Sequence, residues 1–174
     1  DSTRPAATRT LLQDPRVEAL IVSTPTHVMV KHGLGFDACD VAVIDTAAST
    51  PADDITATAI VALERLIGLA TRAVVIDIEH LLRAELTKRR AAADFILISM
   101  QPDCADLDAH ISSGGSAITV DQKADPPLLT LLSASHRQKN IPCPDLDAAC
   151  DRKERKIYLR TLAFVSAAMH ALER

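Results

Sequence analysis

The sequence predicts a three-layer α/β fold in which a mostly parallel sheet lies between helices. Short apolar runs recur along the chain, and between them lie longer segments whose apolar residues repeat at helical spacing. The length of 174 residues fits one domain, and an apolar share of 48% is typical of chains that fold around a core. We therefore expect a single α/β domain over residues 1–174.

The N-terminal part begins with a short predicted helix over residues 4–13, which ends at Asp14-Pro15. Brief, mostly apolar runs at residues 17–22 and 40–44 predict two buried strands. Residues 54–69 then carry apolar side chains at the i, i+4, i+7 and i+8 spacing of an amphipathic helix. These elements open an alternation of strands and helices.

The same alternation continues through the middle of the chain. Residues 73–78 (AVVIDI) predict a strand, residues 79–90 a helix with a basic last turn, and residues 94–100 (DFILISM) a further strand. Positive charge in the last turn suits the helix dipole. Strands separated by helices indicate crossover connections, and these produce a parallel sheet that is covered on both faces.

The pattern changes after the Ser/Gly-rich residues 112–116. Residues 117–120 and 128–132 are apolar enough for a small antiparallel edge of the sheet. Residues 136–151 contain two prolines and predict an irregular connector. Residues 152–172 have the apolar spacing of a long closing helix.

Composition excludes several classes of function. The formal charge of −4 and the small aromatic set of one Tyr and three Phe do not provide the basic surface and stacking rings of a nucleic-acid binder. No apolar run approaches the roughly 18 to 20 residues that cross a bilayer. The first ten residues also lack the apolar stretch of a signal peptide. We expect a cytoplasmic protein that binds neither nucleic acid nor membrane.

The cysteines are scattered without a C-x-x-C pair, and they are Cys39, Cys104, Cys143 and Cys150. In a reducing compartment this arrangement favours free thiols over disulfides or a zinc site. We expect no metal centre.

Three strings near the N-terminus carry a family resemblance: DPRVEA at residues 14–19, GLGFD at 33–37 and CDVAV at 39–43. In this order and spacing the chain resembles the cyanophycin synthetases, in the part of their Mur-ligase-like half that follows the ATP loop. Beyond Thr46 the likeness rests on the order of helices and strands, with few identities. The resemblance implies a Mur-ligase-middle-like domain.

That family implies an ATP-dependent amide ligase, which uses ATP and Mg²⁺ to activate a carboxylate for attack by an amine. The chain contains no G-x-x-G-K-[ST] string to hold phosphates. The glutamate associated with magnesium in the family falls on Ser23, and the lysine of the family's helix falls on Glu64. The D-H-x-G motif falls on AASTPA at residues 47–52, and the nucleotide-contacting N-A-D-D-P segment falls on residues 76–80. We therefore expect a degenerate domain with no catalytic residues, no cofactor and no activity by itself.

One candidate site remains, a ligand crevice at the carboxyl end of the first predicted strand. Its residues are Ser23, Thr24, Thr26, His27, His32, Gly33 and Gly35. Histidines can bind ligands or metals, but two on a loop are also compatible with solvated side chains. The glycines and Phe36 equally suit a scaffold turn, in which Gly33 and Gly35 adopt conformations closed to other residues and Phe36 fills the core.

Other polar groups have simpler explanations. Asp53-Asp54 suits the N-terminus of the following helix, and residues 112–116 suit a flexible turn better than an anion cradle. Cys143 and Cys150 lack a visible base. Residues 136–139 (HRQK) and the cluster at residues 152–156 give local positive charge that is typical of a solvated face. If this face functions, it would meet an acidic partner protein or an anionic polymer.

Three functions stay open. The first is a non-catalytic interaction or assembly module, with a homo-oligomer or a partner protein expected. The second is a fragment or subunit of an ATP-dependent carboxylate-amine ligase whose ATP loop is elsewhere. The third is a small-molecule or anion-binding protein that uses the crevice.

Overall fold

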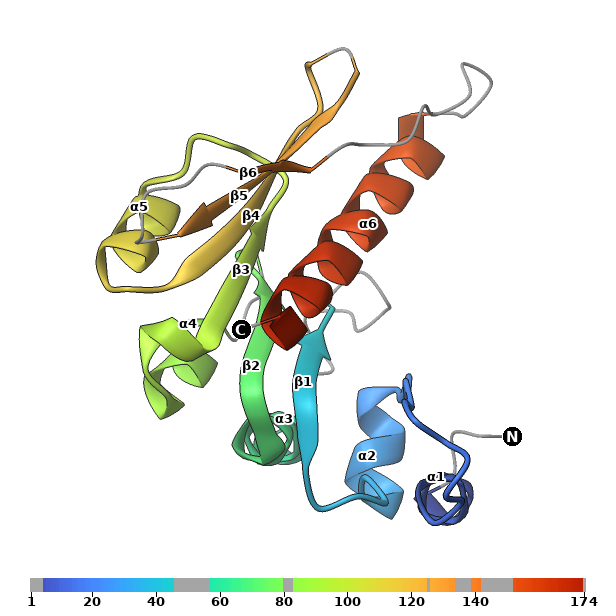
Figure 1. Ribbon diagram of the computed structural model, residues 1–174. Helices are drawn as coiled ribbons and strands as arrows, with labels where there is room; N and C mark the ends of the chain where they lie inside the picture. Colours follow the sequence, from blue (N-terminus) through green and yellow to red (C-terminus); the bar gives the residue numbers. More distant parts are fainter. Residues whose placement is uncertain are drawn as a thin grey trace.

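The computed structural model describes residues 5–45, 57–79, 83–124, 126–133, 139–141 and 152–173, which form an α/β fold with a six-stranded mixed sheet between helices (Figure 1). The strands are β1 (Cys39–Ile44), β2 (Ala70–Asp77), β3 (Phe95–Ser99), β4 (Ser116–Asp121), β5 (Leu128–Ser133) and β6 (Lys139–Ile141). The helices are α1 (Pro5–Leu12), α2 (Thr26–His32), α3 (Ala57–Leu69), α4 (Arg83–Leu86), α5 (Ala105–Ser112) and α6 (Arg152–Glu173). Two 3₁₀ turns, η2 (Thr87–Arg89) and η3 (Ala92–Asp94), lie between α4 and β3.

The strands lie in the sheet in their chain order, from β1 to β6. β1 to β4 pair in parallel, and β5 and β6 continue the sheet in antiparallel pairs. The sheet is therefore mixed. Because β1 to β4 run in one direction, their carboxyl ends share one edge of the sheet.

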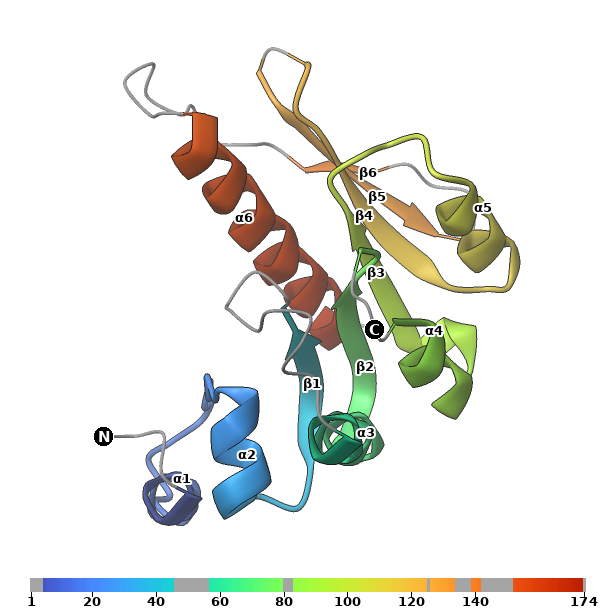
Figure 2. The ribbon, with the colours of Figure 1, turned by 180° about the vertical axis from the view of Figure 1, so that it is seen from behind.

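Helices cover both faces of the sheet. α6 lies across one face and contacts β1 to β4, whereas α3, α4 and α5 lie on the other (Figures 1 and 2). Two hydrophobic clusters follow from this arrangement, one under α6 around Ile96 and Phe164 and one under α3 to α5 around Ile76 and Leu107. Residues on both sides of β3 are buried, which explains why its sequence is a continuous apolar run.

The prediction of a strand at residues 17–22 is wrong. This segment has no regular secondary structure, and the side chain of Ile21 is 96% exposed. A β-prone run becomes a strand only when a neighbouring strand satisfies its backbone groups. Among the described strands, β1 pairs with β2 alone and ends the sheet, and residues 17–22 do not join its outer edge.

The predicted helix over residues 79–90 begins too early, because Glu79 still belongs to a turn, and residues 80–82 lie outside the described residues. The Asp77 side chain accepts a hydrogen bond from the Glu79 amide (2.7 Å) and closes a turn directly after β2. The helical residues described here are those of α4 and η2. Sequence reasoning missed α2, which lies in a segment predicted as a loop, and α5, and it placed β6 inside an irregular connector. It correctly predicted α6 and the other core strands.

Several expectations fall outside the described residues. These are the cap at Asp53-Asp54, the AASTPA segment, Cys143, Cys150 and most of the connector at 136–151. Among the described residues, Cys39 and Cys104 are free thiols. In the same part of the chain, the helices are too short or too polar to cross a membrane.

Candidate functional site

The residues of the predicted crevice lie in and around α2 rather than at the end of a strand. Ser23 and Thr24 precede the helix, while Thr26, His27 and His32 belong to it. His27 and His32 are five positions apart, which at about 100° per residue turns them away from each other. Within the described ranges, no group of three or more His, Cys, Asp or Glu side chains is placed to hold a metal ion.

The two glycines after α2 shape the turn into β1. Gly33 (φ 77°) donates its amide to the Met29 carbonyl (2.8 Å) and ends the helix. Gly35 (φ 76°) lies so close to the start of α1 that a Cβ there would be 2.5 Å from the Pro5 carbonyl oxygen. Phe36 is only half-buried, and Leu34 is the residue that packs against the core. The GLGFD string therefore includes a packing requirement as well as a turn.

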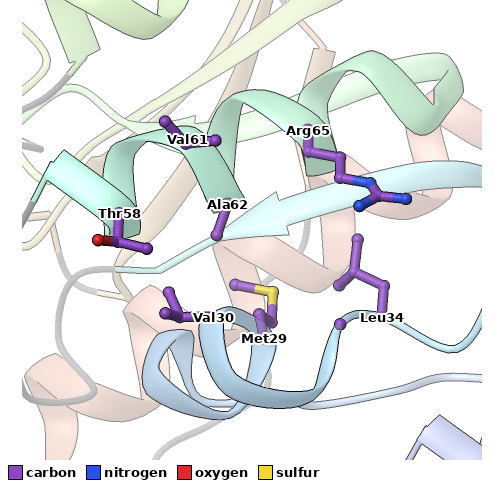
Figure 3. Close-up of a pocket in the computed structure, with 8 residues that line it drawn as sticks. Met29, Val30, Leu34, Thr58, Val61, Ala62 and Arg65 are labelled. Carbon is purple, nitrogen blue, oxygen red and sulfur yellow. The ribbon is translucent and has the colours of Figure 1, made fainter.

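A small pocket of about 160 Å³ lies between α2 and α3 (Figure 3). Its lining consists of Met29, Val30, Gly33, Leu34, Thr58, Val61, Ala62 and Arg65. The walls are mostly apolar, with the Arg65 guanidinium at the Leu34 end and the Thr58 hydroxyl near Val30 (Figure 3). Of the seven predicted crevice residues, Gly33 lines this pocket.

A charged cluster occupies the carboxyl edge of the parallel strands. Asp45 follows β1 and Asp77 ends β2, and the pairing of Ile44 with Ile76 sets these carboxylates side by side on the α6 face. Arg160 Nη2 of α6 lies 2.8 Å from Asp45 Oδ1 and 2.7 Å from Asp77 Oδ2. Its guanidinium also stacks over the Phe164 ring at 5.7 Å.

Two of the three side chains in this cluster are largely withdrawn from solvent, whereas the side chain of Asp45 is 41% exposed. The side chain of Asp77 is 2% exposed and that of Arg160 is 15% exposed. Asp77 Oδ2 is within ion-pair distance of Arg160 but outside hydrogen-bond geometry, so the attraction is mainly between charges. A buried carboxylate needs a cation beside it. Arg160 thus neutralises both aspartates and ties α6 to the sheet.

Sequence reasoning missed this cluster although a signal was present. Both aspartates come directly after apolar strand runs, and adjacent parallel strands bring such positions to one edge. The arginine could not be found in this way because it is 115 residues from Asp45 in the chain.

The Ser/Gly-rich residues 112–116 have a structural role in the fold. Gly115 packs against the ring of His110, leaving no room for a Cβ. His110 Nε2 lies 3.2 Å from the Phe95 carbonyl oxygen, and burial of the ring lowers the pKa of His110. Residues 113 and 114 form a turn between α5 and β4, which agrees with the interpretation as a turn.

The outer face of α6 carries an apolar stripe. Its members lie within about 120° of arc at about 100° per residue, and they are Ile157, Tyr158, Thr161, Val165, Ala168, Met169 and Leu172. Val165 is 51% exposed and Met169 59% exposed. The Thr161 hydroxyl donates to the Ile157 carbonyl (3.0 Å), which leaves its methyl group to continue the apolar surface.

Comparison with protein-family models and with curated proteins finds no match for this chain. The fold and these sites define an α/β protein with a six-stranded mixed sheet, an ion-paired carboxyl edge and an exposed apolar helix face.

Proposed function

We propose that the chain is a non-catalytic Mur-ligase-middle-like domain that acts as an interaction or assembly module. The observation that carries this proposal is the α6 stripe. A helix with apolar residues on two opposite faces usually packs against other protein surfaces on both of those faces. The inner face of α6 packs on the sheet through Leu159, Ala163 and Ala167, whereas the stripe faces solvent. A continuous exposed apolar patch is a common mark of a protein-binding surface.

The carboxyl edge supports the non-catalytic part of the proposal. By the resemblance, the nucleotide-contacting segment of the ligase family falls on residues 76–80, which include Asp77. In the described structure Asp77 is buried and held by Arg160. A carboxylate in this state is poorly placed to serve a hydrated magnesium ion, which keeps several of its waters when it binds.

Calorimetric titration with ATP and Mg²⁺ tests this proposal, combined with light scattering on the same sample. We expect no heat of binding and a defined dimer or larger assembly. Micromolar binding of ATP would favour the alternative, a fragment or subunit of an ATP-dependent carboxylate-amine ligase. If the chain stays monomeric at all concentrations and binds no partner protein, the assembly role is contradicted.

The pocket between α2 and α3 favours a second candidate function, small-molecule binding. Its apolar walls and single guanidinium suit a short apolar carboxylate. Hexanoate is then expected to raise the melting temperature of the chain. The rise should be lost in Arg65→Met and should not occur with hexanol. Equal shifts with the acid and the alcohol would contradict it.

A further inference from the structure

The α6 stripe is arranged symmetrically about its centre. Tyr158 and Leu172 each lie seven residues from Val165, a distance of about 10 Å along a helix. When two copies of such a helix pack antiparallel about a two-fold axis at Val165, each Tyr158 meets Leu172 of the partner subunit. The two Val165 side chains then meet at the axis. A surface that is complementary to itself in this way suits a closed dimer.

Charges beside the stripe favour the same orientation. Arg155 in the first turns of α6 and Glu173 at its end lie on the same flank of the stripe, at about 100° per residue. In the antiparallel arrangement they come within about two residues of each other along the axis, so that each Arg155 is beside Glu173 of the partner subunit. A parallel arrangement would keep Arg155 and Glu173 at opposite ends of the paired helices, so that these ion pairs could not form.

The helix is also held firmly against its own sheet. Arg160 joins it to Asp45 and Asp77, and Arg72 Nη1 donates to the Leu172 carbonyl oxygen (2.6 Å) at its other end. The outer face is therefore presented on a fixed platform, which lowers the entropic cost of association. The small residues Thr161 and Ala168 within the stripe allow two helices to approach closely.

We propose that the partner of the α6 stripe is a second copy of this chain, bound helix to helix in antiparallel orientation with Arg155 of each copy beside Glu173 of the other. This inference rests on the proposed assembly function and names its partner. The apolar stripe provides the stability of the dimer. The two symmetric ion pairs determine its direction.

Sedimentation equilibrium of the chain between micromolar and high micromolar concentration tests the surface. We expect a dimer whose dissociation constant rises more than about tenfold in Val165→Glu/Met169→Glu, because two charges would then be buried. The matched control is Val61→Glu on α3, which changes an equally exposed apolar residue (61% exposed) outside the stripe and is expected to leave the dimer unchanged. Circular dichroism and thermal melting check that both variants remain folded.

Charge exchange tests the orientation. Arg155→Glu and Glu173→Arg are each expected to weaken the dimer about fivefold, and the double variant is expected to restore it. High salt should remove these differences. A dimer that is broken by the stripe variant but not restored by the charge exchange would overturn the antiparallel arrangement and leave the assembly function standing. A dimer unaffected by the stripe variant would overturn α6 as the surface, and a monomer throughout would overturn both proposals.

Discussion

The two faces of the sheet are covered in different ways. A single long helix, α6, covers one face, and its inner side contacts four strands. Shorter helices, α3, α4 and α5, cover the other face and leave a small pocket where α3 meets α2. One helix that spans a face also presents an equally long outer face to solvent, whereas several short helices divide their outer surface. The long exposed apolar surface therefore lies on the α6 side, where we propose that assembly occurs.

The polar groups buried on the two faces differ as well. The α6 face encloses an ion pair between Asp77 and Arg160, while the opposite face encloses the partly buried neutral ring of His110. Breaking a buried ion pair leaves an uncompensated charge, and this costs more than disturbing a neutral contact. We expect the α6 face to be the more sensitive of the two to a single polar substitution.

The largest effect is expected for Arg160→Met. The apolar side chain preserves much of the packing but leaves Asp77 buried without its cation, so the free energy of unfolding should fall by about 3 kcal/mol. Urea unfolding followed by circular dichroism measures it. Adding Asp77→Asn should recover part of the loss, because the uncompensated charge is removed. As a control, Arg16→Ala breaks an exposed ion pair with Asp14 and should not change the free energy of unfolding measurably. An equal loss of stability in Arg160→Met and Arg16→Ala would contradict the expected sensitivity of the α6 face.

A smaller loss is expected on the opposite face for Gly115→Ala. The added Cβ would overlap the His110 ring, which must move away from the Phe95 carbonyl, so the free energy of unfolding should fall by about 2 kcal/mol. Gly114→Ala is the matched control, since it has open space around it but a φ of 90°. Its backbone strain should cost about 1 kcal/mol. Urea unfolding measures both variants. If Gly114→Ala lost more stability than Gly115→Ala, the His110 ring would be free to move.

The pH dependence of stability should also reflect the opposite face. Burial favours the neutral form of His110 and lowers its pKa in the folded state, so this contribution is fully present above the unfolded pKa of about 6.5. As pH falls below that value the unfolded chain takes up the proton first, and stability is lost. Urea unfolding between pH 7.5 and 5.5 should show a larger decline for the natural chain than for His110→Gln. Parallel declines would exclude this role for the histidine.

The smallest effect is expected for Gly68→Ala near the end of α3. Gly68 has no heavy atom within 4 Å of a built Cβ and no unusual φ, so alanine fits without strain. Its lower entropy in the unfolded chain should raise the free energy of unfolding by about 0.5 kcal/mol. A rise in melting temperature measures this gain, and a fall would mean that the outer surface of α3 is in contact with another group.

Much of the sheet could be predicted because its signal is local. The apolar runs of β2 and β3 are continuous because these central parallel strands are buried on both faces, and β1 at the sheet edge buries Ala42 and Ile44. The spacing in α3 and α6 marks which sides face the core. The same logic failed at residues 17–22, whose composition is equally β-prone. A strand also has to be brought alongside the edge of a neighbouring strand, and composition does not report whether the fold brings it there.

The sequence by itself determined the α/β class, the main strands and the positions of the long helices, because side-chain periodicity encodes which residues avoid water. Tertiary structure alone decided that Arg160 meets Asp45 and Asp77, that Gly35 packs on Pro5, and that one face of α6 is left exposed. These features depend on contacts between residues far apart in the chain. Their partners are chosen by how helices pack on the sheet, and no local pattern records that choice.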